Sequence, residues 1–436
     1  MKILQLLMVA IILLSNVYPQ TNYSGYVQNW TAYRIVDDQD LLLLRNRFRL
    51  ETNVAAEWAR GFASLDINHD QHALNDKHEI TLREIFIDLY FNRFDIRIGK
   101  QQVIWGKADG VFINDIVNPL DLRYFLMQDF ENIRMGIPMI KANAYFKGIS
   151  FEGIFIPKFE PWTYAKPGSP WAFQNTPDQL HIQISPGISL PLTVKKSTAV
   201  VPSPNLQNSE IGLKLSMFVV GTDLSLLVLN SFQDQAVNRL KSFDITYDLD
   251  VPVEGLIELQ PEYKRVTMYG LNFSRPIASF VLRGEGSILK NYHFNLIPNA
   301  DLMSSAGNVD ISYNTNYLQA MVGIDMSGPY GTSLSFQYIH KHIQDYLSGT
   351  IQLKEDDQWL TILISGTFWN EEGKARILTI YDHTNDSGIS RFMFDYGIAD
   401  NVKLETGVDV LWGNQESIFG QFDNNDNIYV KLTYSF

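Results

Sequence analysis

Histidine, serine and carboxylate side chains are the groups of this chain that could carry catalysis. The chain has eight histidines, which fall almost entirely in predicted loops or at strand ends. A hydrolytic triad needs a nucleophile, a base and an orienting acid within hydrogen-bond distance, and no Gly-x-Ser-x-Gly nucleophile elbow occurs. Acids that stand close in sequence, such as Asp382 with Asp386 and Asp423 with Asp426, are typical of solvated loops. We therefore predict that the protein is not an enzyme.

Metal-binding patterns are equally weak. Residues 66–70 (DINHD) resemble the start of a calcium loop, but the sixth position is Gln71 rather than glycine and the twelfth is Lys77 rather than glutamate. This excludes an EF-hand and leaves loose divalent binding as an alternative to a polar hairpin tip. The absence of cysteine excludes disulfides, Cys-ligated zinc and iron–sulfur sites. We predict no metal and no cofactor.

The composition of the chain narrows its class. Of the 436 residues, 45% are hydrophobic, 13% aromatic and 19% charged, which is too apolar and aromatic for a disordered chain. Beyond the N-terminus, no apolar run reaches the roughly 18 residues of a membrane-spanning helix. The formal net charge of −13 argues against nucleic acid as a partner, because phosphates favour proteins with excess Lys and Arg.

The first 20 residues have the zones of an export signal. Met1 and Lys2 precede an apolar stretch over 3–14, and polar or small residues follow. The alternative is a buried N-terminal strand or helix. We predict a signal peptide over 1–20 and a mature protein over 21–436.

Apolar and polar side chains alternate in stretches of roughly ten residues along the mature chain, the pattern of strands with two unlike faces. The last stretch places Ile428, Val430 and Leu432 on one face. Counting all stretches gives about eighteen strands, with sixteen as the alternative. They begin near Tyr23, Leu42, Ala55, Glu79, Phe94, Pro138, Ile149, Glu210, Asp223, Tyr263, Ala278, Val309, Tyr330, Gln358, Lys374, Ser390, Val402 and Ile428.

Short turns and long polar connections also alternate, as in a meander whose tight turns all lie at one end. A sandwich usually has shorter strands, and a solenoid needs a fixed repeat, which is absent. We predict an all-β fold: a transmembrane antiparallel β-barrel of the bacterial outer membrane, with lipid as its first partner. Tyr434 and Phe436 at the C-terminus are the predicted assembly signal, read by the barrel assembly machinery.

If the apolar face meets lipid, the opposite face lines the lumen, and it carries charges of both signs. The row Arg45, Arg47 and Arg49 either guides anionic solutes or pairs with carboxylates to stiffen the wall. The predicted lumen-lining residues are Arg45, Arg47, Arg49, Glu84, Asp88, Arg97, Gln101, Arg283, Glu285, Arg391, Asp395, Lys403 and Glu405.

Residues 106–137 are the least strand-like part of the first half. Asn118 as an N-cap and Pro119 at the first helical position predict a short helix that continues over 122–127. We expect this loop to fold inward as a constriction; the alternative is an outward loop. The residues assigned to it are Trp105, Lys107, Asp109, Asn118, Asp121 and Arg123. A second long loop, 158–208, is predicted to form an ordered lid.

Several motifs resemble those of a bacterial outer-membrane family known mainly as a domain of unknown function. They are Arg83-Glu84, IGKQQVIWGKADG at 98–110, VNPLDLR at 117–123 and GSPWAF at 168–173. The resemblance is specific over residues 80–175. It implies an outer-membrane barrel with a porin-like or transport role, in some settings alongside an envelope transporter of lipidic or hydrophobic solutes. It implies no substrate and no site residue.

These observations predict an outer-membrane channel that passes small solutes through a lumen narrowed by loop 106–137. The first alternative is a non-channel partner of an envelope transporter, with a hydrophobic or lipidic ligand. The second is a structural or adhesive barrel whose external loops bind a partner.

Overall fold

The computed structural model describes residues 21–36, 39–71, 77–173, 179–185, 188–248, 251–298, 310–351 and 353–436. The predicted signal peptide over 1–20 lies outside these residues. None of the helices in the described ranges has the length and apolar character needed to cross a membrane.

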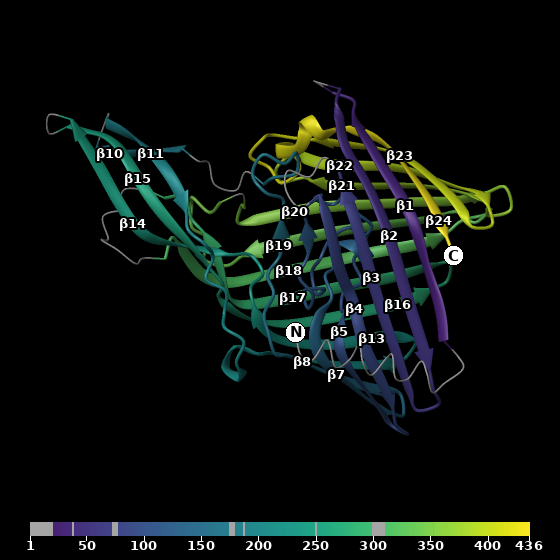
Figure 1. The fold of residues 1–436 in the computed structure, drawn as a ribbon. Coiled ribbons are helices and arrows are strands. Elements are labelled where there is room, and N and C mark those ends of the chain that lie inside the picture. Colours follow the sequence, from purple (N-terminus) through teal and green to yellow (C-terminus); the bar gives the residue numbers. More distant parts are fainter. Residues whose placement is uncertain are drawn as a thin grey trace.

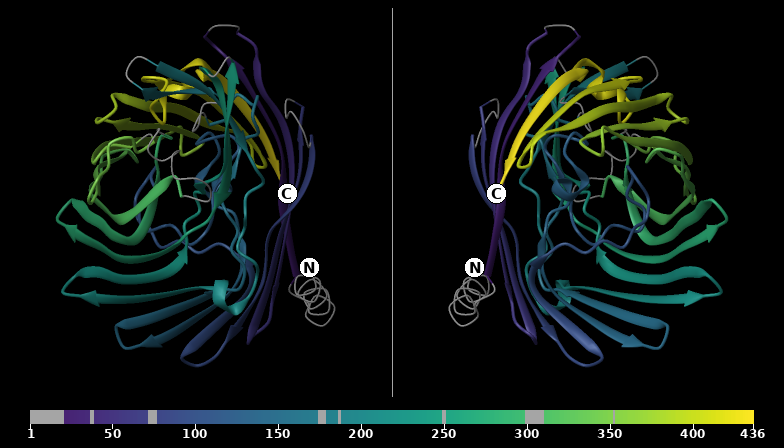
Figure 2. Two further views of the ribbon diagram at one scale, coloured as in Figure 1. Left: turned by 90° about the vertical axis from the view of Figure 1, so that its left-hand side faces the viewer. Right: turned by 90° about the vertical axis from the view of Figure 1, so that its right-hand side faces the viewer.

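Eighteen strands form one closed antiparallel ring, which confirms the predicted fold class and strand number (Figures 1 and 2). Each strand pairs with the next along the chain, except that β5 pairs with β7, β8 with β12 and β13 with β16. The ring closes where β1 pairs with β24. The strands are β1 (Thr21–Arg34), β2 (Leu41–Ala55), β3 (Ala59–Asp70), β4 (His78–Tyr90), β5 (Phe94–Gln101), β7 (Ile137–Phe146), β8 (Ile149–Ile156), β12 (Glu210–Val219), β13 (Thr222–Phe232), β16 (Arg265–Ile277), β17 (Phe280–Asn295), β18 (Ser312–Ser327), β19 (Ser333–Ile343), β20 (Asp356–Phe368), β21 (Gly373–Asp382), β22 (Ser387–Ala399), β23 (Val402–Trp412) and β24 (Asn427–Ser435).

The two faces of each strand meet different surroundings. In β24, Ile428, Val430 and Leu432 are 48, 43 and 46% exposed, whereas Tyr429 and Lys431 between them are buried. The apolar register therefore forms the outer surface and the polar register faces the interior. This is the pattern expected of a sheet whose outside meets lipid, where closure leaves no backbone group unpaired at an edge.

The connections of the ring are sorted by length. Those at one end are short, such as 147–148 and 220–221, while those at the other end reach the length of 102–136 and 157–209. The turn at 220–221 has positive φ at both Val220 and Gly221, the backbone of the two-residue turns that match strand twist. We call the two ends the short-turn end and the long-loop end.

A second sheet of four strands stands apart from the ring at the long-loop end (Figure 1). Its order is β10 (Gln179–Ser185), β11 (Ile188–Lys196), β15 (Val251–Glu262) and β14 (Val237–Asp248), and β11 runs parallel to β15. Leu192 and Ile257 are among the buried residues of its core. The predicted loop 158–208 thus contributes two strands to this sheet, because its apolar residues have a partner in the hairpin β14–β15.

Candidate functional site: the barrel interior and segment 102–136

The inward face of the ring carries charged and polar side chains together with buried apolar ones such as Leu229, Met268 and Ile339. Of the predicted lumen-lining residues, Glu84, Arg97 and Arg283 are half-buried and Lys403 is exposed near the short-turn end. The others are buried: Arg45, Arg47, Arg49, Asp88, Gln101, Glu285, Arg391, Asp395 and Glu405. All of these side chains come from the strand register opposite to the exposed apolar residues.

Many interior charges pair within the wall. Arg49 makes two hydrogen bonds of 2.7 and 2.9 Å to Asp66 on the neighbouring strand. Arg97 is bound in the same two-pronged way to Asp88, at 2.6 and 3.0 Å. Lys431 lies 3.0 Å from Glu405. Such pairs fix side chains in place and cancel charge locally.

The arginine row on β2 also binds segment 102–136. Arg45 and Arg47 donate to the Gln128 amide oxygen at 3.0 and 3.2 Å, and Arg49 donates to Asn132 at 2.8 Å. Three successive inward arginines therefore hold the segment against β2. Arg49 and Arg47 also pair with the wall carboxylate Asp66, at 2.7 and 3.7 Å, as one of the two sequence-based alternatives expects. The amide contacts to segment 102–136 add a role that neither alternative included.

Strands on the far side of the ring hold the same segment. The Glu285 carboxylate on β17 accepts the backbone N–H groups of Lys107, Ala108 and Asn114, the last two at 2.6 and 3.2 Å. Arg283 donates to the Lys107 carbonyl and to the Asp109 carboxylate. A carboxylate that accepts several backbone N–H groups is a strong, charge-assisted anchor.

Two further strands add contacts. On β19, the Gln337 amide bonds both the N–H and the carbonyl of Asp109, at 3.0 and 3.2 Å. On β22, Arg391 donates to the carbonyls of Leu126 and Met127 at 2.7 and 2.9 Å. Segment 102–136 is thus bonded to inward-facing side chains of β2, β17, β19 and β22, which lie around much of the ring (Figure 2).

The predicted helix start at Asn118 is wrong. The Asn118 side chain accepts a bond of 2.6 Å from Val103 N–H and donates to the carbonyls of Gln101 and Met135 at 3.1 and 2.8 Å. It therefore joins the two ends of the segment instead of capping a helix. The one helix in the described part of the segment, α2 (Phe130–Ile133), begins later, after Asp129.

Residues 120–122 are extended and residues 123–126 form turns, so the helix expected over 122–127 does not form. Asp121 and Leu122 make strand β6 (Asp121–Leu122), which pairs in parallel with β9 (Thr163–Tyr164). Arg123 bonds Asp121 at 2.7 Å and Glu79 at 3.1 Å. Pairing with β9 satisfies backbone groups that a helix would have satisfied internally.

Trp105 is the first residue of the segment to be anchored deeply. It is buried, and its indole N–H donates to Glu152 at 2.5 Å. Together with Lys107 and Asp109 at β17, it belongs to the part of the segment that lies against β8 and β17. Asp121 and Arg123 lie elsewhere, next to β4. The six predicted constriction residues are therefore spread along the segment rather than gathered at one point.

Sequence reasoning missed an aromatic cluster formed by three loops. The Phe125 ring lies 4.7 Å from that of Phe422 and 6.4 Å from that of Trp171, and Phe173 packs on Phe422 at 5.3 Å. These rings come from segment 102–136, the first part of 158–208 and the connection 413–426. The available signal was the presence of Phe419 and Phe422 in a connection that was otherwise polar.

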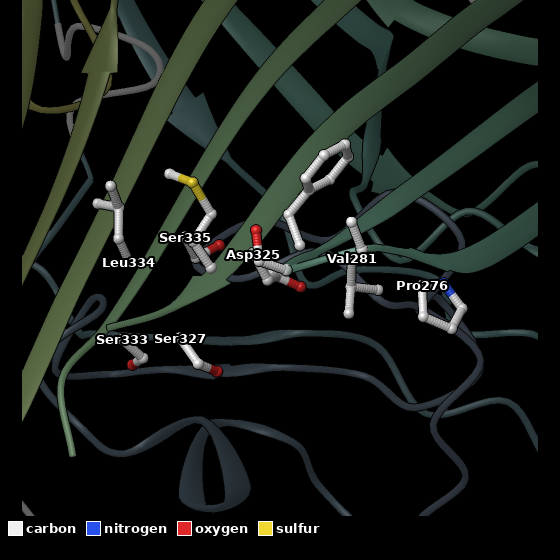
Figure 3. Close-up of a pocket in the computed structure, with 11 residues that line it drawn as sticks. Pro276, Val281, Asp325, Ser327, Ser333, Leu334 and Ser335 are labelled. Carbon is white, nitrogen blue, oxygen red and sulfur yellow. The ribbon is translucent and has the colours of Figure 1, made fainter. Parts of the chain in front are cut away.

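Two of the cavities lined by described residues are open to solvent. One of about 300 Å³ lies between β1–β4 and the segment; its lining residues are Tyr26, Arg49, Glu51, Ser64, Arg83, Glu84, Gln102 and Glu131. The other, of about 280 Å³, lies at the short-turn end, where Pro276, Val281, Asp325, Ser333 and Ser335 are among its lining residues (Figure 3). The first is the more polar and is bounded by the arginines that bind the segment.

The calcium-like residues 66–70 belong to β3 rather than to a loop. Asp66 pairs with Arg49, and the Tyr124 hydroxyl donates to Asp70 at 2.5 Å. The part of the predicted loop at 72–76 lies outside the described residues. Asp66 and Asp70 are therefore engaged with other partners.

Comparison with solved structures finds chains that align with this one over most of its length. Pseudomonas aeruginosa OccD3 aligns over 96% of this chain and 92% of its own, with a TM-score of 0.51 and 9% identity. Salmonella typhi OmpF in complex with daunomycin aligns over 95% and 97%, with a TM-score of 0.42 and 10% identity. A mutant of the Rh. blastica porin aligns over 96% and 100%, with a TM-score of 0.42 and 12% identity. At 9% identity, the likeness to OccD3 shows the fold alone.

At the sequence level, no curated protein matches the chain. A family model does match, over residues 16–386, which include the ring strands from β1 to β21, segment 102–136 and the four-stranded sheet. By this match the chain belongs to the family described as Protein of unknown function (DUF1302).

Proposed function

We propose that the protein is a channel of the bacterial outer membrane that passes small polar solutes, with segment 102–136 narrowing its lumen. One observation carries this proposal: an 18-stranded ring with an apolar outer face encloses an interior that carries many charged and polar side chains. Barrels of 16 to 18 strands are wide enough to leave an aqueous channel.

The narrowing follows from how the segment is held. Its contacts reach Arg45 and Arg47 on β2 as well as Glu285 on β17, so it cannot leave the interior without losing several charge-assisted bonds. Each such bond contributes about 1.5–3 kcal/mol. The solute path in this proposal runs beside the segment.

The charge pattern limits the selectivity that we propose. Field focusing needs an excess of one sign, whereas Arg49 with Asp66, Arg97 with Asp88 and Arg391 with Asp409 pair within the wall. We therefore assign the channel to small polar solutes with weak charge preference. In this proposal the short-turn end faces the periplasm and the long-loop end the exterior, as in other outer-membrane barrels.

Planar-bilayer recording tests the channel. The purified protein is expected to show discrete conductance steps, and a variant lacking residues 111–134 is expected to show steps larger by about twofold or more, because the narrowing element is gone. A point variant, Gln128→Ala, removes the acceptor shared by Arg45 and Arg47. It should increase the fluctuations of the current within each conductance step. Silence of the folded wild-type protein would overturn the proposal.

The aromatic cluster favours a second candidate function, the handling of a hydrophobic or lipidic solute delivered by an envelope transporter. Phe125, Trp171 and Phe422 pack into a buried apolar cluster, and in this second proposal the cluster opens to receive a solute, since ligand sites for such molecules are lined by aromatic side chains. Mass spectrometry of organic extracts separates the two candidates. A co-purifying lipid that disappears in Phe125→Ala would favour the second, and clean extracts together with conductance would favour the channel.

A further inference from the structure

Two histidines and two acids converge on the outer face of the barrel at the long-loop end. His340 Nε2 and His342 Nδ1 each lie 2.9 Å from the same oxygen, Oδ1 of Asp356. The ligand atoms of His342, Glu355 and Asp356 all lie within 4.8 Å of one another. No other such group of three or more ligand residues occurs among the described residues.

Strand geometry builds this cluster. His340 and His342 are two positions apart on β19 and therefore share a face, while Ile339 and Ile343 on the opposite face are buried. The ladder pairs His342 directly with Asp356, the first residue of β20. The adjoining Glu355 is fixed by a backbone bond of 2.8 Å from Ile343 N–H to its carbonyl. The donors are thus placed by the regular sheet and not by a free loop.

We propose that His340, His342, Glu355 and Asp356 form a binding site for a divalent transition-metal ion of the zinc class. Imidazole nitrogens combined with carboxylates suit zinc, copper and nickel. Calcium and magnesium prefer sites made of oxygen ligands alone. Two carboxylates also balance the charge of a divalent cation.

The spacing of the donor atoms supports this assignment. Zinc binds nitrogen and oxygen ligands tetrahedrally at about 2.0–2.2 Å, which places neighbouring ligand atoms about 3.3–3.6 Å apart. The two nitrogen-to-oxygen separations of 2.9 Å are shorter than this spacing by less than 1 Å. Small rotations of the exposed side chains would open room for the ion, because His340 and Asp356 are 41 and 49% exposed.

A bound ion would tie the end of β19 to the start of β20 and so close the base of connection 344–355. That connection is itself joined to a neighbour, since Ile297 N–H donates to the Gly349 carbonyl at 2.8 Å. The site faces away from the lumen, and an ion reaches it from the surrounding medium. The inference is therefore independent of whether the barrel conducts.

Calorimetric titration of ZnCl2 into the untagged, detergent-purified full-length protein tests the site. Wild type is expected to bind zinc. The double variant His340→Ala/His342→Ala is expected either to bind one zinc ion fewer per chain or to bind zinc at least tenfold more weakly. His69→Ala is the matched control, because His69 stacks on His78 at another part of the long-loop end; it should keep this site. Millimolar Mg²⁺ or Ca²⁺ should not displace the zinc.

Asp356→Asn provides a second variant that keeps the shape of the cluster and should also weaken binding. Resistance of the barrel to unfolding in SDS before heating verifies that each variant is folded. The proposal is overturned if folded wild type binds no zinc more tightly than about 100 µM. Equal affinity of wild type and the double variant would overturn it as well, since the cluster would then be only a pair of histidine–aspartate hydrogen bonds.

Discussion

Asp234, in the connection after β13, is an acid in an unfavourable place for a charge. Trp162 donates a hydrogen bond to it, yet desolvation and the nearby Glu210 carboxylate together raise the pKa of Asp234 well above its ordinary value. The pKa of Tyr164 is raised too, mainly by burial and further by Tyr292 and Asp234. Burial and the neighbouring Glu210 carboxylate therefore favour the neutral form of Asp234.

The sign of the pH dependence follows from this shift. A carboxyl whose pKa is raised on folding stabilises the fold below its unfolded pKa of about 3.9, and this contribution is lost as the pH rises through the folded pKa. We expect Asp234→Asn to raise stability by about 1–3 kcal/mol at neutral pH, where it removes a poorly solvated charge, and to have little effect near pH 4. The midpoint of thermal unfolding in detergent, measured at both pH values, gives the result.

Asp223→Asn is the control for this measurement, because Asp223 is exposed at the short-turn end. It should leave both midpoints unchanged. Equal effects of Asp234→Asn at pH 4 and at pH 7 would contradict the burial argument.

Side-chain roles at the site were only partly predictable at this scale. The alternation of polar and apolar residues identifies Arg45, Arg47 and Arg49 as one row, because strand period is local. Arg45 and Arg47 bind Gln128, 83 and 81 positions away in sequence, and Arg49 binds Asn132, 83 positions away. No local pattern encodes these contacts. Asn118 shows the same limit: its residue type suits a helix cap, but its three partners come from Gln101, Val103 and Met135.

At the scale of elements, the ring strands were predictable and the four-stranded sheet was not. A ring strand separates lipid from the interior, so its alternation is strong enough to read in one sequence. Leu190, Leu192, Ile257 and Leu259 alternate as well. Nearby acids such as Asp244, Glu254 and Glu258 favoured a solvated loop instead. The distinguishing fact, that β11 pairs with β15, is a contact between distant segments.

The separate position of this sheet makes the hairpin β14–β15 dispensable for closure. Since β13 pairs directly with β16 over ten residue pairs, a short Gly/Ser linker in place of residues 239–260 should leave the ring intact. We expect this variant to migrate as a folded barrel in SDS before heating, as wild type does. Replacing the turn 220–221 by a Gly/Ser turn of equal length is the matched control. Unfolded migration of the hairpin variant alone would show that the second sheet is needed for the ring.

At the scale of the whole molecule, stability depends on closing an 18-stranded ring between the first and last strands. The pairing of β1 with β24 runs from Tyr26 with Ser435 to Arg34 with Asn427, and Gly25 and Phe436 extend it by two reciprocal backbone bonds of 3.0 Å. The Phe436 ring stacks on Phe48 of β2 at 6.0 Å. Phe436 thus spans the closing seam and contacts two strands at once.

Phe436→Ala should therefore lower the amount of folded protein in the outer membrane by about twofold or more, since a stacked aromatic pair contributes about 0.5–1.5 kcal/mol beyond its burial. Ser435→Ala, at the neighbouring exposed position, is the control and should have no effect. Membrane levels in cells and refolding yield in detergent are measured in parallel. A lower membrane level in cells with a normal refolding yield assigns Phe436 to recognition by the assembly machinery. A decrease in both the membrane level and the refolding yield assigns it to seam closure. If neither quantity changes, both roles are contradicted.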